Sequence, residues 1–176
     1  WKNYGYLWKH LFLIKPLPTD LFQVSDLGGC APFEPNLSFY PSQAYNSRVE
    51  NLTWTVDGRN FSDVNELDLY LDKQGSQTAV SLNYQTIHGC TKPDQTTTLF
   101  VYPDPVADFV FTPEEPSTLD YQVQFYEKTV GASDFVWYVE KDSILKSPRF
   151  IYDFPHDQEG FFEVCLQAQT NFGCVD

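Results

Sequence analysis

The stretch GFFEVCLQAQTNFGC, residues 160–174, decides the fold, because an earlier part of the chain repeats it. It matches GSQTAVSLNYQTIHGC, residues 75–90, without a gap over its last eleven positions. The two Gly-Cys pairs that close these stretches put Cys90 and Cys174 84 residues apart. Self-similarity at a fixed spacing indicates a duplicated structural unit. The chain is therefore expected to contain two copies of one module.

Both copies alternate apolar and polar residues with a period of two, which is typical of half-buried β-strands. Phe162, Val164 and Leu166 share one face of the predicted last strand, while Cys165 and Gln167 lie on the other. The first copy shows the same alternation over residues 78–84. No long segment carries a helical period. The sequence therefore predicts an all-β fold of antiparallel β-sandwiches, with roughly seven strands in each copy.

The alignment also sets the expected limits of the copies. A first sandwich is expected over residues 17–103 and a second over residues 104–176, because the copies begin near Leu17 and Asp104. Residues 1–16 are expected to be the last strand of a preceding repeat or a linker. The first copy continues beyond its Gly-Cys pair with DQTTTLFVYP, residues 94–103. The second copy is expected to lack this last strand.

The charge balance excludes some classes of partner. The chain carries 24 acidic and 11 basic residues, for a formal net charge of -13. A nucleic-acid partner is not expected, because binding a phosphate backbone requires clustered Lys and Arg. Membrane insertion is not expected either, because no apolar run approaches the roughly 20 residues that span a bilayer. A hydrophobic content of 42% allows both halves to bury a core, so the chain is expected to be globular.

Two tryptophans occupy matching positions in the copies. Trp54 and Trp137 each lie in mid-strand among apolar neighbours, where sandwich folds place a core indole. We assign both to the cores rather than to a sugar-stacking surface. Tyr70, Tyr126 and Tyr138 are better sugar candidates, although they form no recognisable platform.

Catalytic and metal-binding motifs are not found. The three histidines have no zinc-site spacing, and no cysteine lies in the sequence context of a catalytic thiol. The acidic loops at residues 103–108 and 153–159 could collect Ca²⁺, but they lack a dense D-x-D-x-D arrangement, which favours a solvated acidic face. The sequence therefore predicts no enzyme, no cofactor and no metal site.

Three stretches of the second copy carry a family resemblance: PVADFVFTP (105–113), VQFYEKTVGASDFVWYV (123–139) and SPRFIYDFPHDQEGFFEVCLQAQTNFGCVD (147–176). They resemble the polycystic-kidney-disease (PKD) type of Ig-like domain, in the form found in tandem in surface and secreted proteins of Bacteroidetes. The first copy resembles the same module, and the likeness covers nearly the whole chain after about residue 17. The usual W-x-F-G-D-G signature is reduced to WTVDG at residues 54–58 and WYVEKD at residues 137–142.

This resemblance implies tandem Ig-like (PKD-type) antiparallel β-sandwiches without catalytic activity. Such modules are structural, adhesive or protein-interaction units of large exported cell-surface proteins, including gliding-motility adhesins and cargo of type IX secretion. The implied partners are other protein domains, neighbouring repeats, surface glycans, or secretion and motility machinery. The alternative is an accessory glycan- or protein-binding module of a secreted hydrolase.

The resemblance also implies a disulfide between Cys30 and Cys90, because the family commonly links these two positions. Four cysteines suit an oxidising, extracellular compartment if they are paired. Cys165 and Cys174 lie on consecutive strands of one predicted hairpin and could bridge. Cys174 could instead pair with a cysteine beyond residue 176, so these two are left open.

Overall fold

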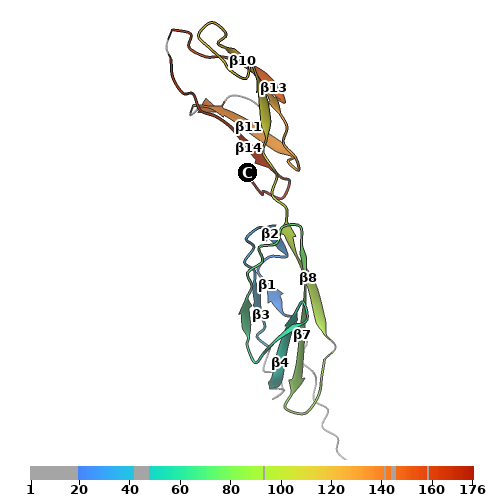
Figure 1. The fold of residues 1–176 in the computed structure, drawn as a ribbon. Coiled ribbons are helices and arrows are strands. Elements are labelled where there is room, and N and C mark those ends of the chain that lie inside the picture. The colour runs from blue at the N-terminus through green and yellow to red at the C-terminus, as the bar shows by residue number, and fades with distance from the viewer. Residues whose placement is uncertain (1–19, 42–47, 93, 141, 144–145, 158) are drawn as a thin grey trace, which may run out of the picture. The chain divides into compact units, whose positions relative to one another are not determined.

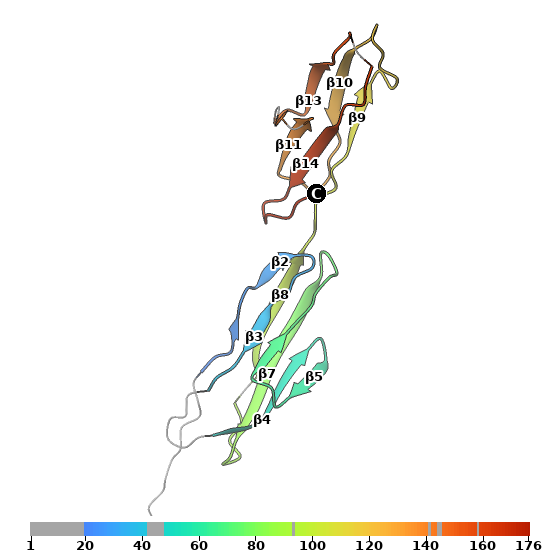
Figure 2. The same ribbon diagram turned by 90° about the vertical axis from the view of Figure 1, so that its left-hand side faces the viewer.

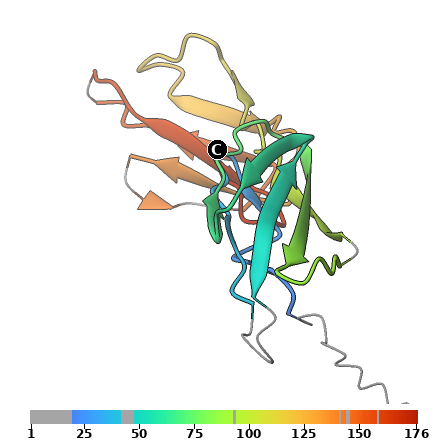
Figure 3. The ribbon, with the colours of Figure 1, turned by 90° about the horizontal axis from the view of Figure 1, so that it is seen from below.

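The computed structural model describes residues 20–41, 48–92, 94–140, 142–143, 146–157 and 159–176. Residues 1–16, expected to be a strand of a preceding repeat or a linker, lie outside this part of the chain. The described residues form strands and loops without a helix, as Figures 1, 2 and 3 show. No described segment thus forms a helix that could cross a membrane. The predicted all-β fold is confirmed.

The first eight strands form two sheets. Their bounds are β1 (Gln23–Val24), β2 (Gly28–Cys30), β3 (Asn36–Ser38), β4 (Val49–Val56), β5 (Arg59–Ser62), β6 (Glu66–Asp68), β7 (Gln77–Thr86) and β8 (Gln95–Tyr102). One sheet has the order β1-β3-β6, and the other has the order β2-β8-β7-β4-β5. β4 pairs antiparallel with β5 and β7, whereas β2 runs parallel to β8.

The last six strands form two further sheets, each of three strands. Their bounds are β9 (Phe109–Thr112), β10 (Gln122–Glu127), β11 (Asp134–Val139), β12 (Asp142–Ser143), β13 (Arg149–Asp153) and β14 (Val164–Gln169). The orders are β13-β10-β9 and β12-β11-β14, and every pair is antiparallel. In Figure 2, β13 and β10 lie side by side, as do β11 and β14. A common core joins the two sheets, so they form an antiparallel β-sandwich.

Packing divides the chain into two compact units. The first contains residues Leu37–Leu67 and Ala79–Thr97, and the second contains Ser25–Asn36, Asp68–Thr78 and Thr98–Asp176. The bounds of these units differ from the bounds of the two sequence copies. The limits 17–103 and 104–176 remain a prediction.

Burial follows the alternation seen in the sequence. On β14, Val164, Leu166 and Ala168 face inward while Cys165 and Gln167 are exposed. β7 shows the same pattern over its whole length, with every second residue from Thr78 buried. A strand buried on one face needs this period, because successive side chains point to opposite faces.

The two central indoles have the same surroundings. Trp54 and Trp137 are both 0% exposed. Trp54 Nε1 donates a 2.9 Å hydrogen bond to the carbonyl of Val64, ten residues later. Trp137 Nε1 donates a 3.0 Å bond to the carbonyl of Ser147, also ten residues later. A buried N–H needs such a partner, and both copies supply it from the same sequence offset.

The closing turns also match. In the first copy, the Thr86 amide donates to the Cys90 carbonyl at 2.9 Å, and the Cys90 amide donates to Thr86 Oγ1 at 3.2 Å. In the second copy, Thr170 and Cys174 make the same two bonds at 2.8 and 3.1 Å. Each turn has a glycine one residue before the cysteine, with φ of 76° and 88°. Glycine adopts such positive φ values without steric cost.

Candidate functional site

A cleft of about 630 Å³ lies in the second copy. We name it the aromatic cleft. It is lined by Phe109, Phe111, Glu114, Pro116, Ser117, Thr118, Tyr121, Val123, Phe125, Phe154, Pro155, Glu159, Gly160, Phe161, Phe162 and Val164. Seven of these sixteen residues are aromatic, so the cleft presents ring surface to solvent.

Two edge strands, β10, and residues from the connections β9–β10 and β13–β14 line the cleft. Phe109 and Phe111 come from β9, which is an edge strand of its sheet, and Val164 begins β14, an edge strand of the opposite sheet. A further wall is the segment Glu114–Thr118, which leads from β9 toward β10. The cleft therefore opens along one flank of the sandwich, between the free edges of its two sheets.

Hydrogen bonds give the segment Glu114–Thr118 a defined turn. The amide and carbonyl of Ser117 bond the carbonyl and amide of Asp120 at 3.2 and 3.0 Å. Ser117 Oγ also accepts from the amides of Leu119 and Asp120, at 3.3 and 3.1 Å. This is the local side-chain capping that favours serine in turns.

Ring contacts form the floor of the cleft. Phe154 lies 5.1 Å from Phe162 and 6.4 Å from Phe125, measured between ring centroids. The Phe125 ring continues into the core, where it stacks on Phe150 at 4.9 Å. The cleft is therefore an extension of the sandwich core that reaches solvent.

Exposed apolar rings mark the mouth of the cleft. Phe161 is fully exposed, at 106%, and Phe111 is also exposed. Two carboxylates, Glu114 and Glu159, also line the cleft. Aromatic surface with a few polar groups is the usual lining of a binding groove. An exposed apolar patch of this kind is typical of an interaction surface.

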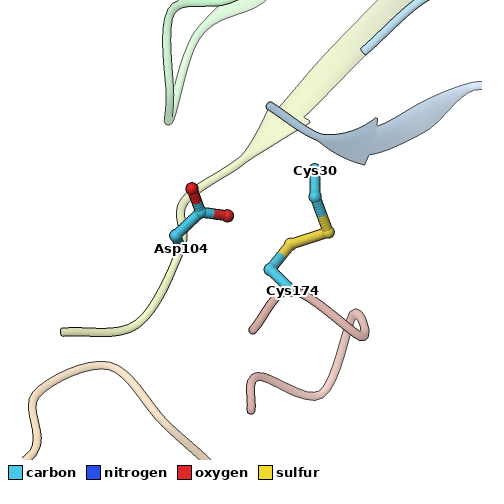
Figure 4. A group of neighbouring side chains, drawn as sticks. All are labelled: Cys30, Asp104 and Cys174. Carbon is cyan, nitrogen blue, oxygen red and sulfur yellow. A yellow bond between two sulfur atoms is a disulfide. The ribbon is translucent and has the colours of Figure 1, made fainter. Parts of the chain in front are cut away.

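A disulfide lies within the second compact unit. Cys30, the last residue of β2, is bonded to Cys174, which follows β14, with a Cα–Cα distance of 5.4 Å. Figure 4 shows this bond with the Asp104 side chain beside it. The expected bridge between Cys30 and Cys90 is wrong, because Cys90 has a free, exposed thiol in the structure.

Strand register explains the correction. Cys30 pairs with Tyr102 at the end of β8, whereas Cys90 precedes the start of the same strand at Gln95. Eight residues at about 3.3 Å each separate the two ends of β8 by more than roughly 20 Å. A disulfide requires Cα atoms within about 7 Å. Cys174 meets this requirement, although it occupies in its own copy the position that Cys90 occupies in the first.

The disulfide sulfurs and Asp104 are also close enough together to suggest a metal-binding group. Their ligand atoms all lie within 4.8 Å of one another. However, both sulfurs are used in the S–S bond, and a metal-binding cysteine must be a free thiolate. The Asp104 carboxylate accepts a hydrogen bond from Gln74 Nε2. We therefore interpret this group as a structural link.

The fourth cysteine, Cys165, has a free thiol on the exposed face of β14. Partial desolvation raises the pKa of this thiol, and so do the charge of Glu163 and the contact between them at 3.7 Å. A raised pKa lowers the fraction of reactive thiolate. This environment is the opposite of the one that activates a nucleophilic cysteine.

The remaining sequence candidates lie apart from the cleft. Tyr70 is exposed, and Tyr126 and Tyr138 are half-buried; none of the three lines the aromatic cleft. The Tyr138 hydroxyl is hydrogen-bonded to Gln167 Oε1 at 3.1 Å. The cleft residues were not predicted from the sequence, because inward-facing aromatic side chains are expected to fill a closed core.

Comparisons with known proteins identify similar folds. No family model matches the chain, and no curated protein sequence matches it. Among solved structures, fibronectin(III)-like modules of CbhA from Clostridium thermocellum are 11% identical, with a TM-score of 0.39 and 88% of each chain covered.

Two further solved structures are similar over most of this chain. SGBP-B of the Bacteroides ovatus mixed-linkage glucan utilization locus, in complex with a mixed-linkage heptasaccharide, is 15% identical with a TM-score of 0.31. Dimeric latent PorU from Porphyromonas gingivalis is 10% identical with a TM-score of 0.27. The matches cover 92% and 84% of this chain, but only 43% and 16% of those proteins. Such distant likenesses say nothing of what this chain binds.

Proposed function

We propose that this chain is a pair of non-catalytic Ig-like modules of the PKD type from a large exported cell-surface protein. Its two modules, residues 17–103 and 104–176, act as spacers and as protein-interaction units. The observation that carries the proposal is the duplication of the same sandwich, down to the hydrogen bond of each central indole. Neighbouring repeats and other protein domains are the proposed partners.

The nature of the repeated residues supports a structural role. The features common to both copies are the buried Trp54 and Trp137 and the Thr-x-x-Gly-Cys turns. These residues fill a core or close a turn. The residues that the two copies share therefore stabilise the fold, as expected for a module whose role is to extend and connect.

The disulfide supports export. A bond between Cys30 and Cys174 persists in oxidising compartments such as the cell exterior, and it is rare in a reducing cytosol. The net charge of -13 also favours a well-solvated, monomeric module at a cell surface. Because the chain resembles PKD-type repeats, the proposal extends to proteins of gliding motility and type IX secretion.

The test is made on the protein in the cells that produce it. Intact cells are treated with a membrane-impermeant protease and a membrane-impermeant thiol reagent, and the peptides are then identified by mass spectrometry. We expect cleavage on intact cells, labelling of Cys90, and a recovered Cys30–Cys174 cross-linked peptide. Protection of the chain until lysis, or reduced Cys30 and Cys174 in the native protein, would overturn the proposal.

The aromatic cleft favours a second candidate, an accessory glycan-binding module. Exposed rings such as Phe161 and Phe111 offer faces on which a sugar can stack, and Glu114 and Glu159 offer hydrogen-bond acceptors. A glycan array separates the two functions. Saturable binding that Phe161→Ala abolishes and Tyr70→Ala leaves intact would favour this candidate over the spacer. No binding to any glycan would remove it.

A further inference from the structure

We propose that the carboxylate of Asp104 protects the disulfide between Cys30 and Cys174 from reduction by thiols. Its negative charge repels an attacking thiolate, and it also disfavours the thiolate that the reaction releases. This role is separate from the proposed function of the chain, since it concerns only how long the bond survives when a thiol reductant is present.

The end of β8 brings the three side chains together. Cys30 on β2 is the register partner of Tyr102, the last residue of β8, and Asp104 follows two residues later. Phe172, on the closing turn of the second copy, stacks on Tyr102 with the ring centroids 4.0 Å apart, and Cys174 lies on the same turn. Figure 4 shows the Asp104 side chain beside the S–S bond. Its carboxylate oxygen and the two sulfur atoms all lie within 4.8 Å of one another.

A hydrogen bond holds the Asp104 side chain in this position. Gln74 Nε2 donates to Asp104 Oδ2. Two backbone bonds fix the turn that carries Gln74 to β8. The Gly75 amide donates to the Val101 carbonyl at 2.9 Å, and the Val101 amide donates to the Ser76 carbonyl at 3.0 Å. Among the described residues, no lysine or arginine forms an ion pair with Asp104. Gln74 therefore orients the carboxylate without neutralising its charge.

Burial decides which sulfur atom a thiolate attacks. Cys174 is only 1% exposed, whereas Cys30 is half-buried. An incoming thiolate therefore bonds to the sulfur of Cys30, the S–S bond breaks, and Cys174 leaves as a thiolate. A second thiolate then attacks the reagent's sulfur in this mixed disulfide and releases Cys30. Two reagent thiols are thereby oxidised to one disulfide, and the two protein sulfurs take up protons from water.

The Asp104 carboxylate opposes the first of these two steps. The attacking thiolate spreads one negative charge over three sulfur atoms, and two of them lie within 4.8 Å of the carboxylate. Like charges at this separation repel each other, and the repulsion is stronger in a partly buried site than in water. The departing Cys174 thiolate is also buried, which disfavours a charged group further. The intact disulfide has no charge, so the carboxylate opposes the reaction without destabilising the bond.

The test compares reduction rates of the oxidised 176-residue chain and of its Asp104→Asn variant. Asparagine keeps an oxygen that can accept the hydrogen bond from Gln74, but it removes the charge. Cys90 and Cys165 are first alkylated, so that these free thiols cannot exchange with the disulfide. Samples taken during reduction by mercaptoethanol are quenched and alkylated with a second reagent, and the newly labelled peptides are quantified by mass spectrometry. At low ionic strength, we expect the variant to be reduced about tenfold faster.

The charge of the reductant separates an electrostatic role from a structural one. The gain in Asp104→Asn should be largest with mercaptoethanesulfonate, which adds a negative charge, and smallest with cysteamine, which adds a positive one. Added salt should reduce the gain, because salt screens the charges. An uncharged phosphine attacks without bringing a negative charge, so it should reduce both proteins at similar rates. An equal gain with the phosphine would show that the substitution only opens the site, and it would overturn the inference.

Two further variants complete the test. Glu114→Gln removes the same charge from the aromatic cleft, and its reduction rate should equal that of the unchanged chain. Asp104→Glu keeps a carboxylate, so its disulfide should be reduced more slowly than that of Asp104→Asn. Equal rates for Asp104→Asn and the unchanged chain would refute the protective role, and so would a Glu variant that is reduced as fast as the Asn variant. Either result would leave the pairing of Cys30 with Cys174 and the proposed function intact.

Discussion

The indole of Trp137 donates a hydrogen bond from Nε1 to the carbonyl oxygen of Ser147, 3.0 Å away and ten residues later in the chain. This bond fixes Ser147, shortly before β13, against the core, because a fully buried N–H cannot turn to solvent instead. The edge of the Phe109 ring meets the same indole at 5.1 Å between ring centroids. Trp137 therefore joins three parts of the second sandwich at one point.

Replacement of this indole should destabilise the second sandwich. Trp137→Phe leaves the Ser147 carbonyl without its donor, which costs about 1–3 kcal/mol, and the smaller ring opens a cavity that adds to the loss. The measurement is the urea-induced unfolding transition followed by circular dichroism. Phe161→Ala is the matched control, because that ring is exposed. A loss below about 0.5 kcal/mol for Trp137→Phe would contradict the packing described here.

The disulfide between Cys30 and Cys174 should stabilise the oxidised chain strongly. It closes a loop across 144 residues, for which the chain-entropy model gives about 5 kcal/mol. Reduction, or the change Cys174→Ser, is expected to lower the unfolding temperature, whereas Cys90→Ser should leave it unchanged. Peptide mapping without reduction provides a direct check. A cross-linked Cys30–Cys90 peptide would disprove the pairing.

Much of the fold was predictable because it follows from local patterns. The alternation on β7 and β14 requires one buried face whatever the neighbours are. The matching positions of Trp54 and Trp137 followed from the repeat alone, and the structure places both indoles at full burial. The period is set by a few adjacent residues, and the repeat is found by comparing the two copies directly, so neither requires knowledge of the packing.

The disulfide and the cleft depended on long-range placement. β2, whose sequence is Gly-Gly-Cys, has no apolar alternation. The sequence therefore did not predict this strand, which runs parallel to β8. The pairing of β2 with β8 places Cys30 beside Tyr102, at the end of β8 that is far from Cys90. The cleft likewise depends on the packing around Val164, which lines it and is only half-buried. A side chain of the right type predicts an inward face, but it does not predict whether the face is closed.

The thiol of Cys165 should react slowly at neutral pH. Partial desolvation and the neighbouring Glu163 raise its pKa above the ordinary value of 9.0, so little thiolate is present. The measurement is the rate of alkylation by iodoacetamide in the Cys90→Ser variant, where Cys165 is the remaining free thiol of the described residues. Glu163→Gln should accelerate the reaction, and the rate should rise with pH. Equal rates with and without Glu163 would show that the carboxylate has no role.

Tyr84 should make the first copy sensitive to alkaline pH. Burial raises the pKa of its hydroxyl above 10.0, and so does the charge of Asp20. The hydroxyl therefore stays protonated in the folded state at pH values where it has ionised in the unfolded chain. Its contribution to the free energy of unfolding is fully present below about pH 10 and is lost as the pH rises through the folded-state pKa. Unfolding temperatures at pH 8 and above pH 10 provide the measurement.

The variant Tyr84→Phe is the control for this effect, since it keeps the ring that stacks on Phe39 at 5.1 Å. It removes the titrating hydroxyl, so its unfolding temperature should fall less between the two pH values than that of the unchanged chain. An equal fall in both proteins would assign the alkaline sensitivity to other groups.

Gly29 should be a position of β2 that tolerates no side chain. A Cβ atom added there would lie 2.4 Å from Cδ2 of Phe33, far inside van der Waals contact. The Phe33 ring cannot move aside easily, because it is buried and its backbone exchanges hydrogen bonds of 2.8 and 2.9 Å with Leu71. Gly29→Ala is therefore expected to destabilise the chain by about 1–3 kcal/mol, as overpacking does. Gly160→Ala is the matched control, since its nearest neighbour is 3.8 Å away, and equal unfolding temperatures for the two variants would refute the close packing of β2.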